Sequence, residues 1–180
     1  MTKKVLLLHA WYATPDSHWY PWIRDELVKK GYEVSIPKLK DNEKPILSRW
    51  TKSALRENSL DEGTIMIGHS LGAVLALRLV ENSTAKVAGL ITVSGWDFWS
   101  LVPEHKTFFE NPIEHKQIIK NASKRIVIHS DNDPYFTEYT AHEFSKRMKA
   151  KWMMLKGRGH FTKDSGVVEF PELLWEIEAK

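Results

Sequence analysis

Cysteine is absent from the 180-residue chain, which excludes disulfide bonds, a thiol nucleophile and thiolate metal ligands. Long apolar runs are absent as well, since no segment reaches the roughly eighteen uninterrupted apolar residues of a membrane span. The run from Val5 to Ala10 is too short for the hydrophobic core of a secretory signal. We therefore expect a cytoplasmic protein that makes no contact with a membrane.

The chain also has only a small excess of one sign of charge. Lys and Arg number 26 against 23 Asp and Glu, a formal net charge of +3, and the two signs are interleaved along the chain. Because there is no basic stripe, we expect no nucleic-acid partner. The eight histidines form no His-Glu-x-x-His pattern and no paired ligand spacing, so the sequence predicts no metal site.

The length suits one well-buried core, and we expect a single domain over residues 1–180. Continuous apolar runs are typical of strands buried on both faces of a parallel sheet, and here they alternate with helix-like periodicity. The pattern predicts an α/β fold, a mostly parallel sheet with helices on both faces. Strands are expected at 5–10, 32–37, 64–69, 87–94, 125–129 and 152–155, and helices at 19–27, 46–58, 71–80, 113–121, 141–150 and 167–179.

One predicted strand runs directly into Gly68-His69-Ser70-Leu71-Gly72, and a predicted helix follows at once. A chain that reverses this sharply strains the serine and leaves no room for a Cβ two residues before or after it. The helix N-terminus, with the N–H of Leu71, would face negative charge that develops beside Ser70. The pattern is typical of a serine nucleophile for acyl transfer, and the plain alternative is a chance match.

A serine hydroxyl needs a base to remove its proton, and a carboxylate to orient that base. In a parallel sheet such groups lie beyond the carboxyl ends of the strands. His160, in a glycine-containing loop after the last predicted strand, is the predicted base, and the alternative is an ordinary loop histidine. His9 and His129 are expected to hydrogen-bond loop backbone near the site, and His69 to face away from the serine.

Aspartates follow two predicted strands. Asp133 is preferred as the orienting carboxylate because Pro134 limits the freedom of its turn, whereas Asp131 could simply cap that turn through its side chain. Asp97, at the end of the fourth predicted strand, is a third candidate. The plain alternative is that these aspartates only form turns.

With serine, aspartate and histidine in this chain order, the protein resembles a small lidless α/β-hydrolase of the serine hydrolase family typified by retinoblastoma-binding protein nine. The resemblance extends over nearly the whole chain. Besides the serine turn, it is carried by segments 17–22, 93–95, 108–112, 130–134 and 159–161 in a shared order. Only the serine turn is specific by itself.

The resemblance implies a three-layer α/β/α sandwich without a cap domain, in which a six-stranded parallel sheet has the order 2-1-3-4-5-6. It also implies a triad of Ser70, Asp133 and His160 that hydrolyses small carboxylic esters or related acyl compounds through an acyl-enzyme, without a cofactor. The first loop departs from the family pattern. Where family members often carry glycines, this chain has His9-Ala10-Trp11-Tyr12.

The backbone N–H of Trp11 would be the second oxyanion donor beside that of Leu71, because any residue except proline can supply one. Trp11, Trp19, Trp96 and Trp99 are candidates for the walls of an apolar acyl pocket. The alternative for each is an ordinary core or surface aromatic residue.

Two functions follow from these observations. The first is a serine esterase acting on a small-molecule ester. The alternative is a protein that keeps the hydrolase fold and acts mainly as a protein-binding module, although nothing in the sequence indicates a protein partner. A complete set of three candidate groups favours catalysis, since a pure binding module gains nothing from keeping all three at strand ends.

Overall fold

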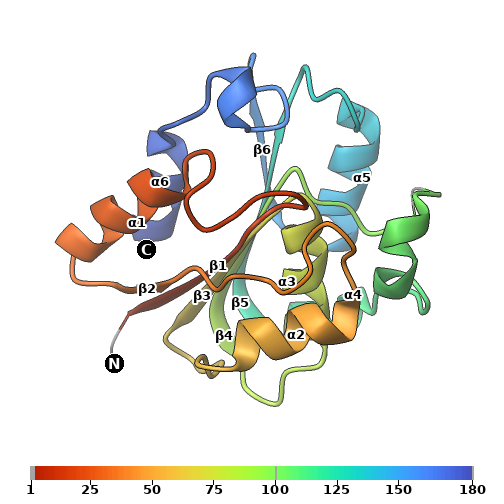
Figure 1. The fold of residues 1–180 in the computed structure, drawn as a ribbon, viewed down its shortest axis with the longest axis horizontal. Helices are drawn as coiled ribbons and strands as arrows, with labels where there is room; N and C mark the ends of the chain where they lie inside the picture. Colours follow the sequence, from red (N-terminus) through yellow and green to blue (C-terminus); the bar gives the residue numbers. More distant parts are fainter. Residues whose placement is uncertain (1–2, 100, 180) are drawn as a thin grey trace.

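The structure of the protein is a computed structural model that describes residues 3–99 and 101–179. Six parallel strands lie in the order β2-β1-β3-β4-β5-β6, with helices on both faces (Figure 1). This α/β architecture and strand order confirm the prediction. The strands are β1 (Lys4–Leu8), β2 (Glu33–Ser35), β3 (Thr64–His69), β4 (Val87–Val93), β5 (Ala122–Ser130) and β6 (Lys151–Leu155). The helices are α1 (Tyr20–Lys29), α2 (Leu47–Leu55), α3 (Leu71–Glu81), α4 (His115–Asn121), α5 (Glu138–Arg147) and α6 (Pro171–Glu178), with short 3-10 helices η1 (Pro103–Phe108) and η2 (Lys163–Ser165).

The central strands bury both of their faces, which explains their continuous apolar sequences. In β1, Val5 and Leu7 pack into the core beneath α1 and α6, whereas Leu6 and Leu8 pack into the core shared with α2, α3, α4 and α5. The alternation follows from the two-residue repeat of a strand. The two cores therefore correspond to the two helical layers that flank the sheet in Figure 1.

Helix α3 is buried along nearly its whole length, from Leu71 to Val80. A helix that is apolar on all sides suits a central position. Arg78 is its charged exception: it pairs with Glu81 at 2.8 Å and donates to the backbone oxygen of Phe108 at 2.9 and 3.0 Å. These bonds fix the segment after β4 against α3.

Several boundaries differ from those predicted. Helix α5 begins at Glu138 rather than at 141, because the side chain of Thr137 accepts a hydrogen bond from the N–H of Thr140 and caps the helix. Helix α6 begins at Pro171 rather than at 167, after Gly166 has turned the chain through a left-handed conformation. Among the described residues, no helix combines the length and apolar character needed to cross a membrane.

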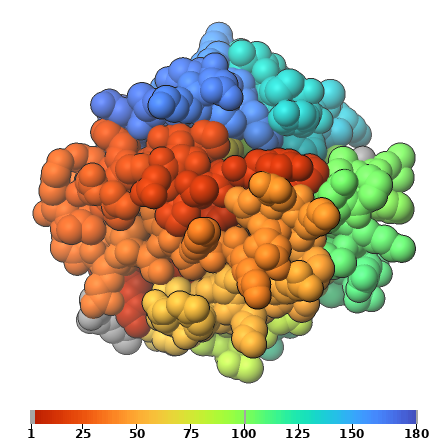
Figure 2. All heavy atoms as spheres, in the orientation of Figure 1, coloured from red at the N-terminus to blue at the C-terminus, as the bar shows by residue number. Residues whose placement is uncertain are grey.

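The segment between β4 and α4 contains one short 3-10 helix, η1, in its described part. His105 and Phe108 of η1 are buried, whereas Phe98 and Trp99 are 40% and 45% exposed. In Figure 2 this segment (green) lies at the margin of the visible face, beside the segments that follow β1 (red) and β2 (orange). The buried residues of η1 therefore anchor this segment, while Phe98 and Trp99 before η1 are exposed. We call it the overhanging segment.

Close backbone contacts hold the turn between β3 and α3. Ser70 has φ 54° and ψ −125°, a region that strains any residue other than glycine. A Cβ on Gly68 would lie 2.3 Å from the Cα of Ala73, and one on Gly72 would lie 2.2 Å from the carbonyl oxygen of Leu8. Glycine at both positions therefore lets α3 approach the end of β1.

We expect Gly72→Ala to lower the free energy of unfolding by about 3 kcal/mol, because the added methyl would meet backbone atoms that cannot turn aside. The matched control is Gly89→Ala in β4, where the nearest atom to the new Cβ would be 3.6 Å away. That change is expected to cost less than about 1 kcal/mol. Urea unfolding followed by circular dichroism measures both, and equal stabilities of the two variants would contradict this account.

Candidate active site

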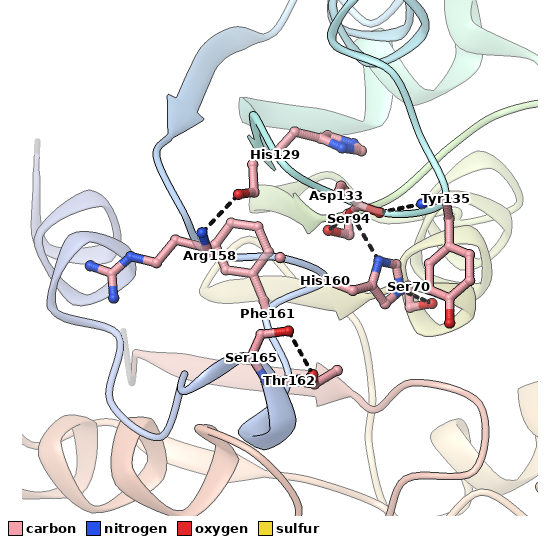
Figure 3. A network of polar contacts seen from close by, with 12 residues as sticks. Ser70, Ser94, His129, Asp133, Tyr135, Arg158, His160, Phe161, Thr162 and Ser165 are labelled. Carbon is pink, nitrogen blue, oxygen red and sulfur yellow. Dashed lines mark hydrogen bonds and ion pairs between the residues drawn. The ribbon is translucent and has the colours of Figure 1, made fainter.

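Three of the predicted residues meet at the carboxyl edge of the sheet. Ser70 follows β3, Asp133 follows β5 and His160 follows β6. The His160 Nε2 lies 2.9 Å from the Ser70 Oγ, and the His160 Nδ1 lies 2.9 Å from the Asp133 Oδ2. Figure 3 shows the three side chains in one continuous row. In this arrangement, the imidazole can accept the serine proton while the carboxylate holds its other nitrogen.

Ser70 lies where β3 becomes α3. Its N–H donates to the carbonyl oxygen of Val93 at 2.9 Å, and its own carbonyl accepts from the N–H of Ala73 at 2.8 Å. Leu71 is the first residue of α3, so its N–H has no partner within the helix. The partial positive charge of the helix N-terminus is therefore directed toward the serine.

The loop after β1 forms a tight turn in which the N–H of Ala13 donates to the carbonyl oxygen of Ala10 at 3.2 Å. Tyr12 takes φ 60° there, a left-handed conformation that glycine adopts without strain. The Trp11 indole N–H donates to the carbonyl oxygen of Glu43 at 3.2 Å. The turn thus forms without the glycines of the family pattern, and the oxyanion role of Trp11 stays a prediction.

The backbone before His160 is held by side chains of the loop after β5. Three successive N–H groups, at 157, 158 and 159, donate to Asp131 Oδ1, Ser130 Oγ and Asn132 Oδ1 at 2.8, 2.9 and 2.8 Å. Asp131 therefore has a structural task of its own. The polar run of residues 130–132 was visible in the sequence, but the backbone N–H groups that it binds were not.

His69 supports His160 from the other side. Its Nε2 lies 2.8 Å from the His160 carbonyl oxygen, and its Nδ1 lies 2.6 Å from the Tyr20 hydroxyl. The same hydroxyl accepts from the N–H of Ala10 at 3.0 Å. Burial lowers the pKa of His69 well below its usual value, so the ring is neutral, with its proton on Nε2. This buried chain links the loop after β1 to the loop of His160.

The side chain of Asp133 has no exposed surface and accepts three hydrogen bonds. Its Oδ1 accepts from the N–H of Tyr135 at 2.9 Å, and its Oδ2 accepts from the Ser94 hydroxyl at 2.7 Å as well as from His160. Burial by itself would raise the pKa of Asp133, but the hydrogen bonds, His160 first among them, outweigh it and lower the pKa. Asp133 therefore stays ionised. Ser94 was missed as a site residue, because a serine after a strand carries no pattern of its own.

The third candidate carboxylate lies elsewhere. Asp97 accepts from Arg147 at 2.6 and 2.8 Å and lies 2.8 Å from the Nε2 of His115. Burial would raise the pKa of Asp97, yet these partners lower it. It thus joins the loop after β4 to α4 and α5, and the structure brings Asp133 rather than Asp97 to His160.

Two other histidines at strand ends contact backbone, as predicted. His9 accepts from the N–H of Leu39 at 3.1 Å, and the Nε2 of His129 lies 2.8 Å from the carbonyl oxygen of Gly95. Burial lowers the pKa of both, that of His129 to about 4. Both rings are therefore neutral at neutral pH.

Two of the four tryptophans that were predicted to line a pocket, Trp19 and Trp96, are buried. Trp19 has no exposed surface, and its indole N–H donates to the Phe161 carbonyl oxygen at 3.1 Å. The prediction that Trp19 lines a pocket is wrong, because its ring fills the core beneath α1 and α6. Trp96 is also buried and stacks on Phe136 at 4.8 Å between ring centroids, so it packs against that ring and has little surface for a substrate.

Aromatic residues beside His160 were missed by the sequence analysis. The ring of Tyr135 lies 4.7 Å from the imidazole and that of Phe136 lies 6.3 Å from it, centroid to centroid. Their position directly after the Asp-Pro pair was the available signal. Trp11 is half-buried against His105, and Trp99 is exposed, so their role as pocket walls stays a prediction.

The family model of serine hydrolases matches residues 5–178 of the chain. The chain belongs to the serine hydrolase family. The protein is similar to YdeN of Bacillus subtilis (strain 168), with 29% identity over 177 residues, 95% of this chain and 92% of that protein. It is also similar to serine hydrolase RBBP9 of Rattus norvegicus, with 32% identity over 167 residues, 89% of this chain and 85% of that protein.

Solved structures agree with this assignment. The crystal structure of the B. subtilis ydeN gene product gives a TM-score of 0.90 at 27% identity and covers 99% of this chain and 100% of that one. Est1E from Butyrivibrio proteoclasticus gives a TM-score of 0.71 at 15% identity, covering 99% and 89%, and shows the fold alone. The protein is a serine hydrolase enzyme of the RBBP9 and YdeN family.

We expect Asp133→Asn to lower kcat for p-nitrophenyl acetate about a hundredfold or more, because imidazole without its carboxylate takes the wrong tautomer. Asp131→Asn and Asp97→Asn are the matched controls. Asn keeps the Oδ1 that accepts from Gly157, so the first control should stay within about fivefold of the parent. If a folded Asp97→Asn variant lost as much activity as Asp133→Asn, the orienting carboxylate would be Asp97.

Proposed function

We propose that this serine hydrolase is an esterase that cleaves small carboxylic esters or related acyl compounds through an acyl-enzyme on Ser70. The observation that carries the proposal is the unbroken row of hydrogen bonds from Ser70 through His160 to Asp133. In a protein that acted only through binding, nothing would require a half-buried serine at a strained φ to contact an oriented imidazole.

The reaction follows from these positions. The Ser70 Oγ attacks the ester carbonyl carbon while the His160 Nε2 takes its proton, and the N–H groups of Leu71 and Trp11 stabilise the oxyanion. Collapse of the tetrahedral intermediate expels the alcohol, which receives the proton from His160. Water then attacks the acyl-enzyme with His160 again as base, which releases the acid and restores the serine. Asp133 orients His160 throughout, and no cofactor takes part.

The surroundings favour a small substrate. Aromatic side chains lie close to His160, as expected for an apolar acyl group. The overhanging segment after β4 is short, and its base is fixed by Arg78 and by the buried residues of η1. An open apolar cleft, rather than a deep tunnel, fits this arrangement.

We expect a fluorophosphonate to modify Ser70 alone, because only a serine with an adjacent base and oxyanion donors reacts quickly with such electrophiles. Mass spectrometry of the labelled protein at neutral pH locates the adduct. Ser70→Ala should abolish labelling, whereas Ser145→Ala, which removes a buried serine in α5, should leave it unchanged. An adduct on another serine, or none in folded protein, would contradict the catalytic assignment.

We also expect p-nitrophenyl esters from acetate to about hexanoate to be cleaved with higher kcat/KM than the palmitate ester. Methylenes beyond the cleft stay in water and contribute little to transition-state binding. A chain-length series with initial rates above and below the solubility limit provides the measurement. Rates that climb steadily to palmitate, or a jump at a lipid interface, would mean that the overhanging segment works as a lid.

A further inference from the structure

The Ser94 hydroxyl approaches Asp133 at the end of β4. Ser94 is fully buried, and its Oγ lies 2.7 Å from the Asp133 Oδ2, the same oxygen that accepts from the His160 Nδ1. A carboxylate can only accept hydrogen bonds, so the hydroxyl is the donor. Figure 3 shows Ser94 beside Asp133.

The backbone conformation that places this hydroxyl is strained. Ser94 takes φ 47°, a left-handed conformation that is strained for a residue with a Cβ. Its N–H donates to the carbonyl oxygen of Ile128 at 2.9 Å. The carbonyl of the next residue, Gly95, accepts from His129 at 2.8 Å, and a Cβ on Gly95 would lie 2.7 Å from the Cβ of Ala73. Ser94 is thus fixed relative to both β5 and α3.

The three donors to Asp133 together hold both oxygens of its carboxylate. The N–H of Tyr135 holds Oδ1, while Ser94 and His160 share Oδ2. With two donors on Oδ2, rotation of the carboxylate about its Cβ–Cγ bond breaks a charge-assisted hydrogen bond. A fully buried carboxylate finds no water to replace that bond.

We propose that Ser94 is a positioning residue for the Asp133–His160 pair: its hydroxyl fixes Oδ2 toward His160 and disperses the negative charge that stabilises the imidazolium. The proposal rests on the roles of Ser70, His160 and Asp133 in the proposed function. Ser94 does not touch the reacting atoms. It acts through Asp133, so that the imidazolium is stabilised enough to form during catalysis but still releases its proton.

Other titratable groups face this pair from neighbouring elements. They are His69 of β3, His129 of β5, His18 of the loop before α1 and Tyr135 of the loop after β5. Burial lowers the pKa of the three histidines, so their rings are neutral at neutral pH. The donors to the carboxylate therefore control how strongly it holds the imidazolium proton.

Replacing Ser94 tests the inference. In Ser94→Ala the carboxylate loses a donor, becomes a stronger acceptor and holds the imidazolium proton to higher pH. The titration midpoint of the His160 ring, followed by NMR of its Cε1 proton and assigned by comparison with His160→Gln, should rise by about half a pH unit. The acidic limb of kcat/KM should move with it, and kcat should fall about three- to tenfold with KM within about twofold.

Two further variants complete the design. Ser94→Gly also removes the hydroxyl but accepts φ 47° without strain, so it gives a folded test where alanine fails to fold. Ser145→Ala removes a buried hydroxyl that donates to the His142 carbonyl oxygen at 2.7 Å, and it should leave the midpoint and kcat unchanged. A hydroxyl with a merely structural role would change stability without moving the titration.

The midpoint decides the outcome. A rise in the folded Ser94 variants supports the inference, whereas a midpoint that stays within about 0.1 pH unit of the parent, or falls, overturns it. A different result would contradict the proposed function. If the parent enzyme neither hydrolysed esters nor reacted with a fluorophosphonate, the esterase proposal would be wrong. The NMR titration reports on the Ser94–Asp133 contact in either case.

Discussion

The close approach of α3 to the end of β1 is the constraint on which the site depends. Gly72 lies against the carbonyl oxygens of Leu8 and His9, and this contact places the helix N-terminus directly behind Ser70. The strained φ of Ser70 persists because the surrounding structure over-determines it: almost every residue of α3 is buried, and the Ser70 N–H continues the ladder toward Val93. The energy that holds the serine in place therefore comes mainly from burial of the helix that follows it.

The position of His160 depends on backbone contacts from two directions. The side chains of residues 130–132 bind three successive N–H groups before it, and His69 binds its carbonyl oxygen. Through Tyr20, the contact from His69 continues to Ala10 in the loop after β1. His69, the residue before Ser70 in the Gly-x-Ser-x-Gly turn, thus connects the loop of His160 to the loop that is expected to supply an oxyanion donor. A shift of either loop would therefore move the other.

Burial and the three residues of the Ser70–His160–Asp133 row were predictable from the sequence, but most of the other hydrogen-bond partners were not. The apolar runs gave the strands and the parallel sheet because a strand covered on both faces must be apolar at every position. The glycines around Ser70 gave the turn, since their spacing has a steric cause. Trp19 was misplaced because an apolar ring suits a pocket wall and a core equally well. The role of Ser94 was not predicted, although the resemblance placed β4 beside β5, because a strand order does not say which side chains meet beyond the ends of two neighbouring strands.

Burial also links the electrostatics of the site to the stability of the fold. His9, His69 and His129 have lowered pKa values in the folded protein, so the unfolded chain binds protons that the folded chain does not. Their contribution is fully present above the usual histidine pKa, and it is lost as pH falls through the folded values, about 4 for His129. Asp133, whose pKa is lowered as well, loses its contribution on the same side but at still lower pH. Acid therefore weakens the packing around the catalytic site by protonating the unfolded chain at His9, His69 and His129 before the folded chain, so the stability of the fold favours neutral or alkaline conditions.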